Sequence, residues 1–288
     1  MAARHHHLLS VAAIVVAVAL LASPAAGYPF LNCGSSTYTA KSQYLKNIYR
    51  IGAILPSNAS QSPDLFAAAH LGAVPDQVWA LALCRGDANA SGCFTCLDQA
   101  FRDLPNACPY SRTATVFYDS CLLQYSNVHS RPTDDTTYSP MRALRNAFNA
   151  TAEPARFQRV VAALVNATVD YAVRNSTRLY ASGEADFDRE LPRVYAWAQC
   201  TPDLTPARCR DCLVQNMVYL STLFTDAIGA RVVGLRCSYR YETAPFFDGP
   251  VMVRLAGTAN SSGAPPASAP AVVPNVLTPA RAAAGEGK

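Results

Sequence analysis

Two closely spaced cysteine pairs are the residues of this 288-residue chain whose spacing could support chemistry. Cys93-Phe94-Thr95-Cys96 and Cys209-Arg210-Asp211-Cys212 have the Cys-x-x-Cys spacing of thiol oxidoreductases and of one half of a zinc ribbon. A zinc ribbon needs two such pairs in one domain, and a redox pair must be free of other disulfides. Because further cysteines lie near both pairs, we expect structural disulfides, with a redox pair and a zinc site as the alternatives.

The ten cysteines reveal an internal repeat. Four of them recur in the same order at an offset of 116 residues, and Val78-Trp79-Ala80 corresponds to Val194-Tyr195-Ala196 at the same offset. Four cysteines at one offset indicate a tandem duplication. The corresponding cysteines are Cys84, Cys93, Cys96 and Cys121 in the first copy, and Cys200, Cys209, Cys212 and Cys237 in the second.

Two cysteines of the first copy lack a counterpart, since Cys33 and Cys108 shifted by 116 fall on Asn149 and Phe224. The joint loss of both positions suggests that Cys33 pairs with Cys108. Such a bridge closes a long loop and stabilises by about 4 kcal/mol in the chain-entropy model. The other four cysteines of each copy allow three pairings. Among these we favour Cys84–Cys93 with Cys96–Cys121, and Cys200–Cys209 with Cys212–Cys237.

The N-terminal segment predicts export from the cell. Arg4 is followed by the apolar run Val11–Ala22 and by small residues around Ala26 and Gly27, the pattern of a cleaved signal peptide. The run is shorter than the ~20 apolar residues of a spanning helix, so we expect a secreted, extracellular protein with no membrane span. Six Asn-x-Ser/Thr sequons agree with a secreted glycoprotein: Asn58, Asn89, Asn149, Asn166, Asn175 and Asn260.

Composition argues against several classes of function. The chain is 50% hydrophobic, which excludes a wholly disordered protein, and its 24 basic and 20 acidic residues give a net charge of +4. No basic stripe is present, so we expect no nucleic-acid partner. No nucleophile–base pair, paired acids or phosphate-binding loop is visible, and we expect no enzyme activity, cofactor or metal. His70 and His129, the histidines beyond the signal peptide, are expected to be surface or packing residues.

Hydrophobic periodicity predicts the same elements in both copies. The elements expected in the first copy are helices at 43–55 and 93–104, the second of them stopped by Pro105, and strands at 77–84, 113–118 and 121–125. Those expected in the second copy are helices at 155–173 and from a cap at Thr205 to about 223, and strands at 193–200, 229–234 and 236–242. Each copy is predicted to be an α+β unit, an antiparallel sheet packed against two helices.

The domain boundaries follow from changes in composition. A polar, proline-containing stretch separates the copies, and the C-terminal part is dominated by Ala, Pro, Gly and Ser, too few apolar groups to fold. The predicted order is a signal peptide at 1–27, a first domain at 28–130, a linker at 131–139, a second domain at 140–247 and a disordered tail at 248–288.

Tandem Cys-x8-Cys-x2-Cys units behind a signal peptide resemble the plant cysteine-rich repeat secretory proteins and the ectodomains of cysteine-rich receptor-like kinases and plasmodesmata-located proteins. Their shared module is the ginkbilobin-2-homologous domain, also called the stress-antifungal domain or DUF26. The resemblance covers roughly residues 28–247. It implies, for each repeat, two helices on a five-stranded antiparallel sheet stapled by disulfides, and it agrees with the pairing favoured above.

The resemblance also implies a sugar site in the second copy. The ginkgo antifungal member of the family binds mannose through an Asn beside the first cysteine, an Arg in Ala-Ile-Gly-Ala-Arg and a Glu 11 residues later. Arg231, in a matching Ala227–Arg231 segment, and Glu242 fit this pattern. The Asn is assigned to Asn149, where a glycan would obstruct the site, with Asn146 as second choice. The corresponding first-copy residues are Gly34, Thr115 and Ser126, so no such site is expected there.

The expected function is a secreted, non-enzymatic, mannose-type lectin-like or defence protein of the plant apoplast, with mannose-containing glycans as partners. The alternative is an extracellular module in signalling or at cell–cell channels, whose partners are extracellular proteins or receptor ectodomains. A thiol-redox protein is a lesser alternative. Arg231 and Glu242 could also form an ordinary cross-strand ion pair.

Overall fold

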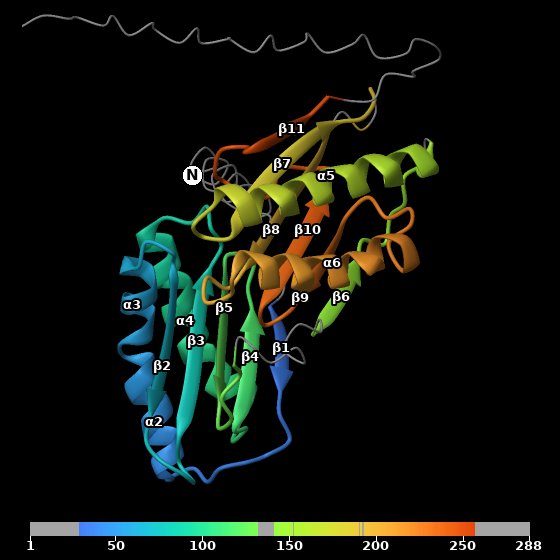
Figure 1. The fold of residues 1–288 in the computed structure, drawn as a ribbon. Coiled ribbons are helices and arrows are strands. Elements are labelled where there is room, and N and C mark those ends of the chain that lie inside the picture. The colour runs from blue at the N-terminus through green and yellow to red at the C-terminus, as the bar shows by residue number, and fades with distance from the viewer. Residues whose placement is uncertain (1–28, 132–140, 152, 190, 192, 257–288) are drawn as a thin grey trace, which may run out of the picture. The chain divides into compact units, whose positions relative to one another are not determined.

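The computed structural model describes residues 29–131, 141–151, 153–189, 191 and 193–256 (Figure 1). The expected signal peptide, nearly all of the expected linker and the sequon Asn260 lie outside the described residues. The two repeats belong to one compact unit of the chain. Each repeat has a separate hydrophobic core between its sheet and its helices, as the repeated sequence pattern predicts.

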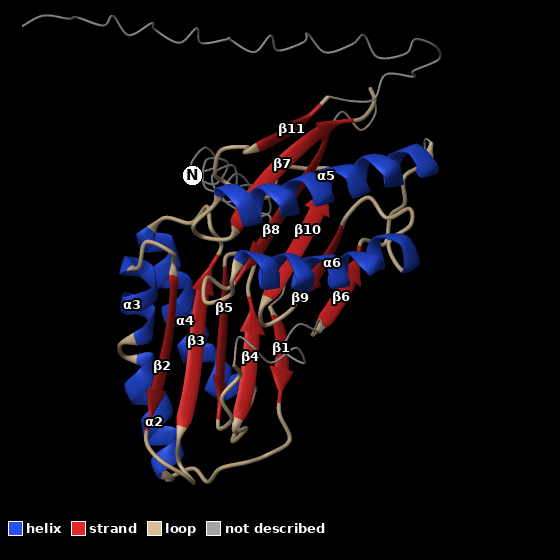
Figure 2. Cartoon of the chain, in the orientation of Figure 1, coloured by secondary structure: helices blue, strands red, loops and turns tan. Residues whose placement is uncertain are grey.

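The first repeat is a five-stranded antiparallel sheet in the order β1-β4-β5-β3-β2, with helices on one face (Figure 2). Alternate residues of β3 take opposite sides: Ala80 and Ala82 join the core under the helices, and Leu81 and Leu83 face away from it. The elements are β1 (Phe30–Cys33), α2 (Gln43–Gly52), α3 (Leu55–Gln61), β2 (Phe66–Leu71), β3 (Val78–Cys84), α4 (Ala90–Ala107), β4 (Thr113–Phe117) and β5 (Cys121–Ser126).

Two helix boundaries differ from the sequence prediction. The helix expected at 43–55 is split: α2 ends at Gly52, and α3 begins at Leu55 with Pro56 in its first turn, where a proline is tolerated. Pro105 was expected to stop the next helix, but α4 continues through it to Ala107. The proline lies in the last turn, where the loss of one backbone hydrogen bond does not break the helix.

The second repeat has the same plan with one additional strand. Its sheet has the order β11-β7-β8-β10-β9-β6, and β11 runs parallel to β7, whereas all other pairs are antiparallel. The elements are β6 (Arg142–Arg145), α5 (Pro154–Asn175), β7 (Tyr180–Asp186), β8 (Arg193–Cys200), α6 (Pro206–Thr222), β9 (Ala230–Val233), β10 (Cys237–Glu242) and β11 (Val253–Leu255). The expectation that disorder begins at residue 248 is therefore wrong for residues 248–256, because β11 hydrogen-bonds to β7.

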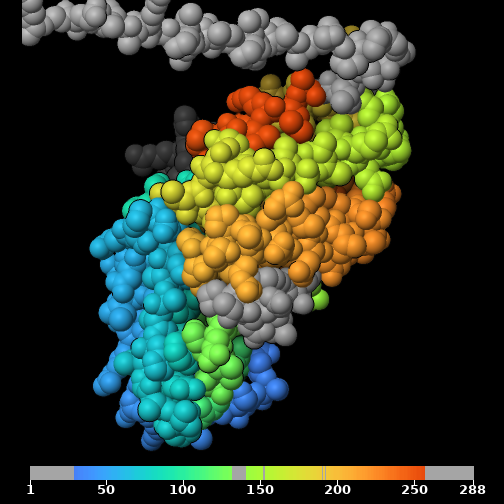
Figure 3. All heavy atoms as spheres, viewed as in Figure 1, coloured from blue at the N-terminus to red at the C-terminus, as the bar shows by residue number. Residues whose placement is uncertain are grey.

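The helices of the second repeat begin where the sequence indicates. Thr205 caps α6 by accepting a hydrogen bond from the backbone N–H of Arg208 at 3.3 Å, and Pro206 follows in the first turn. Buried residues such as Phe157, Leu164 and Val169 place one face of α5 on the sheet. Figure 3 shows α5 and α6, in yellow-green and orange, side by side as a continuous surface over this sheet.

All ten cysteines form disulfides in the pairing favoured from the sequence. In each repeat, one bridge joins the end of an inner strand (β3 or β8) to the first turn of the following helix, and a second joins that helix to the start of the neighbouring strand in the sheet (β5 or β10). Cys93 and Cys96 are bonded to different partners, so this Cys-x-x-Cys does not form the internal disulfide of an oxidoreductase. The bridges are Cys33–Cys108, Cys84–Cys93, Cys96–Cys121, Cys200–Cys209 and Cys212–Cys237.

The helix-free side of the first sheet packs against the second repeat. Leu83, Phe117 and Leu122 form a buried cluster with Val233 and Leu235 of the β9–β10 hairpin. Apolar contact of this kind stabilises the pair of repeats by removing side chains from water. Among residues 29–256, where the structure describes them, no helix is long and apolar enough to cross a membrane.

Polar contacts surround this apolar cluster. Gln199 Nε2 donates to the carbonyl of Cys84 at 3.0 Å, and the Arg178 guanidinium donates to the carbonyls of Pro63 and Gly86 at 2.7 Å each. Arg85 and Asp87 of the first repeat, both with buried side chains, form an ion pair, and Asp87 Oδ2 accepts hydrogen bonds from the backbone N–H groups of Asp248 and Gly249 after β10. These contacts couple the two repeats.

Candidate functional site

The backbone register corrects the position expected for the sugar-binding Asn. Cys33 lies opposite Ala114 in the first sheet, and Arg145 lies opposite Ala230 in the second. Since Ala114 and Ala230 are equivalent at the offset of 116, Arg145 and not Asn149 takes the place of Cys33. The offset is thus 112 in this part of the repeat, and the residue after the missing cysteine is Asn146, the second choice from the sequence.

The hydrogen bonds of the next residue agree with this register. The N–H of Gly34 donates to the Thr113 carbonyl at 2.6 Å, and the N–H of Asn146 donates to the Gly229 carbonyl at 2.7 Å. Asn146 Oδ1 also accepts from the N–H of Phe148 at 3.0 Å. Its side-chain amide nitrogen is the group suited to donate to a ligand.

Asn149 has other contacts. It pairs with Ala227 in an isolated bridge, and its Oδ1 accepts a hydrogen bond from Arg145 Nη2. The same guanidinium forms an ion pair with Asp226 at 3.1 Å. The exposed Asn149 is therefore part of a polar cluster beside the β9–β10 hairpin. It does not take the place of the Asn in the expected Asn–Arg–Glu sugar site.

Glu242 lies directly against Gly229. A β-carbon added to Gly229 would lie 1.8 Å from Glu242 Oε2, so the carboxylate occupies the space that a larger residue would fill. Glu242 accepts from Arg240 Nε at 2.9 Å. Burial raises the pKa of Glu242, and the neighbouring Arg240 opposes this shift. Asn146 and Glu242 thus both contact Gly229, one from each neighbouring strand segment.

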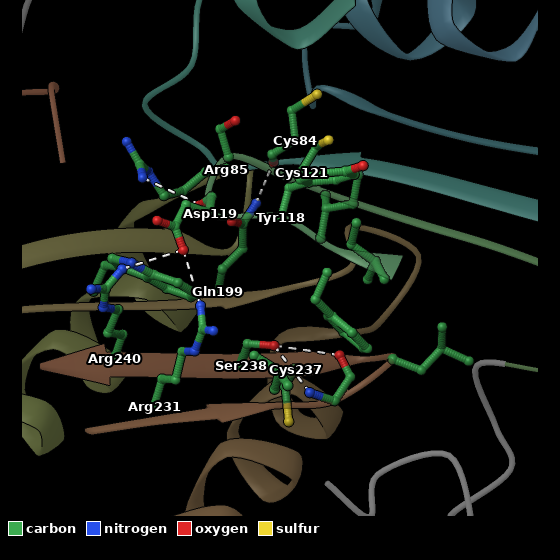
Figure 4. A pocket seen from close by; sticks show the side chains of 18 of the residues that line it. Cys84, Arg85, Tyr118, Asp119, Cys121, Gln199, Arg231, Cys237, Ser238 and Arg240 are labelled. Carbon is green, nitrogen blue, oxygen red and sulfur yellow. Dashed lines mark hydrogen bonds and ion pairs between the residues drawn. The ribbon is translucent and has the colours of Figure 1, made fainter. Parts of the chain in front are cut away.

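Arg231 is held by the first repeat. It lies directly opposite Arg240 in the β9–β10 ladder, and this like-charged pair is bridged by Asp119 from the β4–β5 turn (Figure 4). Arg231 Nη1 and Arg240 Nη1 approach Asp119 Oδ1 at 3.0 and 3.5 Å. The expected direct pairing of Arg231 with Glu242 is replaced by a chain of charges that runs from Arg231 through Asp119 and Arg240 to Glu242.

Two residues of this cluster were missed by sequence reasoning. Arg240 could have been found, because it lies two residues before Glu242 on β10 and the two side chains therefore share one face of the strand. Asp119 could not, because it comes from the other repeat and only the packing of the repeats brings it near Arg231.

The cluster offers both donors and acceptors to a ligand. Guanidinium and amide nitrogens donate, and the Glu242 carboxylate accepts, which suits the vicinal hydroxyls of a sugar. A small cavity of about 50 Å³ lies beside Arg231 and Arg240 and is also lined by Trp197 (Figure 4). Trp197 Nε1 itself is buried and has no hydrogen-bond partner among the described residues.

The first repeat has no equivalent cluster at the corresponding positions. Thr115 is fully buried and accepts from Gln124 Nε2 at 3.1 Å, and Ser126 hydrogen-bonds to Thr113. The described residues contain no group of three or more potential metal ligands. Five sequon asparagines are exposed on the surface: Asn58, Asn89, Asn149, Asn166 and Asn175.

Comparison with known proteins finds one family match in each repeat. The chain matches the family described as Salt stress response/antifungal twice, over residues 32–128 and 144–244. It is 43% identical to Cysteine-rich receptor-like protein kinase 6 of Oryza sativa subsp. japonica, over 85% of this chain and 37% of the kinase. The chain spans about two fifths of the length of the rice receptor kinases that it matches.

Shorter relatives are covered almost completely. Cysteine-rich repeat secretory protein 38 of Arabidopsis thaliana is 33% identical over 73% of this chain and 81% of the relative. Antimicrobial ginkbilobin-2-like protein of Castanea crenata is 32% identical over 83% of this chain and 97% of the relative.

Solved structures share the fold. The tandem DUF26 ectodomain of the Arabidopsis thaliana cysteine-rich receptor-like protein PDLP8 superimposes with a TM-score of 0.62 at 21% identity, covering 75% of this chain and 98% of the ectodomain. The chain thus has the fold of a tandem DUF26 ectodomain. The chain belongs to the Salt stress response/antifungal family and contains two of its domains in tandem.

Proposed function

We propose that the protein is a secreted, non-enzymatic binding protein of the plant extracellular space that takes a mannose-type sugar at Asn146, Arg231 and Glu242. The observation that carries the proposal is the meeting of Asn146 and Glu242 at Gly229, with Arg231 two residues further along β9. The relatives named as secretory and antimicrobial support the location and a role in defence.

Asp119 sets the condition for binding. Its carboxylate accepts from Arg231 in the way a sugar hydroxyl would, so a ligand must share or displace it. Sugar binding is therefore expected to be weak in the wild-type chain. Replacement of Asp119 by asparagine keeps the side-chain shape, removes the charge and frees the Arg231 donor for the ligand.

The test is titration calorimetry with methyl α-mannoside and with mannan on the full chain. Arg231→Ala and Asn146→Ala should each abolish the binding heat, and Asp119→Asn should increase affinity several-fold. Arg50→Ala, an exposed arginine on α2 far along the chain from the cluster, is the matched control and should bind as wild type. Absence of binding by both the wild type and Asp119→Asn would refute the sugar site.

A second candidate is an extracellular protein-interaction module without sugar binding. The observation that favours it is the Arg231–Asp119 pair, which gives this arginine a purely structural use between the repeats. Under this alternative, Arg231→Ala lowers the stability of the chain, and neither the wild type nor the variant binds sugar. Thermal unfolding of Arg231→Ala beside the calorimetry separates the two functions.

A further inference from the structure

A second cavity lies on the helix-free side of the first sheet, and of its lining residues Arg236 alone also lines the cavity beside Arg231. It has a volume of about 250 Å³. Its walls come from β2, β3, β5 and the segment after β5, and from two residues of the second repeat. The lining includes Ala68, Trp79, Leu81, Gln124, Asp203 and Arg236. Its volume is just below the ~300 Å³ at which pockets for drug-sized ligands begin, so one ring is the size that fits.

A stack of three flat rings forms one wall. The indole of Trp79 lies between the imidazoles of His70 and His129, with ring centroids 3.9 Å apart on each side and interplanar angles of 23° and 13°. His70 is placed by its register opposite Trp79, and His129 by the turn of the chain after β5. Both histidines were expected to be surface or packing residues, and they pack on Trp79 at the mouth of this cavity.

In the second repeat, an aromatic ring covers the residue that corresponds to Trp79. The residue equivalent to Trp79 is Tyr195, and the chain after β10 returns to put the ring of Phe247 against it, edge to face at 6.2 Å. The chain's own aromatic ring thus covers the helix-free face of the second sheet near Tyr195. At the first repeat, His129 takes the corresponding place on Trp79, and the cavity lies beside the two rings.

The charges around the cavity favour a neutral ligand. Arg236, almost completely buried, is neutralised by Asp203 at 2.7 Å. Burial and the nearby Arg131 and Arg236 lower the pKa of His129, which favours its uncharged form. An anion would have to lie beside the Asp203 carboxylate, and a cation beside these arginines and His129.

Only a few groups remain to bind a polar atom. Gln124 Nε2 is used by Thr115 Oγ1 at 3.1 Å, which leaves the amide oxygen as an acceptor. The Arg236 guanidinium nitrogens already donate to Thr201, Asp203 and Ser130, or in the case of Nε have no accessible surface, so the Gln124 amide oxygen is the group that can face a ligand. A pyranose would place most of its hydroxyls against Ala68, Leu81 and the ring stack, where they would lose their hydrogen bonds to water.

We infer that this cavity binds a small, neutral aromatic molecule that carries one hydroxyl group, a phenol. The ring packs against the His70–Trp79–His129 stack and Leu81, and the hydroxyl donates a hydrogen bond to the Gln124 amide oxygen. This site is separate from the proposed sugar site and does not depend on it.

The two tryptophans of the chain allow a direct measurement. In a Trp197→Phe variant, Trp79 is the single tryptophan and is excited selectively over the tyrosines at the long-wavelength edge of its absorption; Trp197 Nε1 makes no hydrogen bond among the described residues, so this change removes none. Titration with phenol should change Trp79 fluorescence saturably, whereas benzoate and benzylamine should bind at least tenfold more weakly. Saturation-transfer NMR on the wild-type chain provides the same measurement without any substitution.

Variants locate the site. Ala68→Phe, which fills the cavity from an exposed position on β2, should lower phenol affinity at least tenfold, and Ala73→Phe, exposed in the loop after β2, is its matched control. Arg231→Ala should leave phenol binding unchanged, because it acts at the other site. No saturable phenol signal in either measurement, equal affinity in Ala68→Phe, or an equal Trp79 response to methyl α-mannoside would overturn the proposal.

Discussion

The two repeats share a backbone plan but secure their outer strand differently. In the first repeat, Cys33 at the end of β1 is bonded to Cys108 after α4. In the second, Arg145 takes the place of Cys33 and pairs with Asp226, and the residue equivalent to Cys108 is the buried Phe224. The two disulfides that both repeats retain join helix and sheet. The contrast teaches that the helix–sheet staples are common to both repeats, whereas the tie to the outer strand is replaceable.

A second difference places the functional cluster. In the first repeat, Gly34 approaches Thr113 so closely that an added β-carbon would lie 2.9 Å from the Thr113 side chain. In the second repeat the small residue is on the opposite strand: Asn146 faces Gly229. Because Gly229 has no side chain, the carboxylate of Glu242 lies directly against it. A single exchange of small and large residues thus separates a closed strand pair from a candidate binding site.

The largest effect on stability is expected from removing the Cys33–Cys108 disulfide. A Cys33→Ser/Cys108→Ser double variant opens a link across a sequence separation of 75 residues and should lower the free energy of unfolding by about 4 kcal/mol. Arg145→Ala, which removes the partly exposed ion pair at the equivalent position, should cost less than about 1 kcal/mol. Urea unfolding followed by circular dichroism measures both, and similar losses would contradict the comparison.

The next effect concerns the contact between repeats. Asp87→Ala leaves Arg85 buried without its partner, and should destabilise the chain by roughly 3 kcal/mol. The control is Asp248→Ala, because the Asp248 side chain is 97% exposed and its pair with Arg85 is long. The second repeat, which lacks the outer disulfide, should unfold together with the first in wild type and separately in Asp87→Ala. A single unchanged transition in the variant would show that this pair does not couple the repeats.

Asp87 also gives the stability a pH dependence. Its hydrogen bonds and ion pair with Arg85, together with the N–H groups of Asp248 and Gly249, outweigh burial and lower its pKa. A carboxyl group with a lowered pKa in the folded state stabilises above its unfolded pKa of about 4, and this stabilisation is lost as the pH falls through the folded value. Asp87→Asn should flatten the acid limb of the stability curve.

Glycine substitutions test the exchange of small residues. Gly34→Ala meets the Thr113 side chain and its carbonyl at 3.1 Å, so we expect a loss of about 1–3 kcal/mol from overpacking. Gly229→Ala meets only the end of the flexible Glu242 side chain, which can rotate away. It should cost less stability but abolish sugar binding. Thermal unfolding and mannoside calorimetry on both variants decide this, and retained sugar affinity in Gly229→Ala would remove Glu242 from the site.

The smallest effect is the pH dependence of sugar binding. Because burial raises the pKa of Glu242, this residue takes up a proton at a higher pH than an exposed glutamate and then loses acceptor capacity. Mannoside affinity should therefore begin to fall while exposed glutamates are still ionised. Glu242→Gln should bind weakly and independently of pH in this range. A pH profile unchanged by Glu242→Gln would assign the titration to another group.

The repeat, the helices and the disulfide pairing could be predicted because they leave local patterns in the sequence. That Asn146 is the residue corresponding to Gly34 could not be predicted, because the offset between the repeats changes from 116 to 112 in a region where the second repeat has no cysteine. β11 was missed because three residues beside a stretch rich in Ala and Pro carry no strand signal until β7 offers them a partner. Asp119 and the ring stack at Trp79 depend on the packing of distant segments, which periodicity does not describe.

The short segment after β10 also has a protective role against self-association. Residues 246–255 follow the last cysteine, yet they place Phe247 on Tyr195 and hydrogen-bond β11 to β7. A chain ended at residue 247 would keep every disulfide but leave the backbone N–H and C=O groups along one side of β7 without strand partners. Such an open edge is a template for pairing with another molecule. The eight residues from 248 to 255 therefore cover this edge of β7 and protect it against edge-to-edge aggregation, in a domain whose cysteines are already all paired.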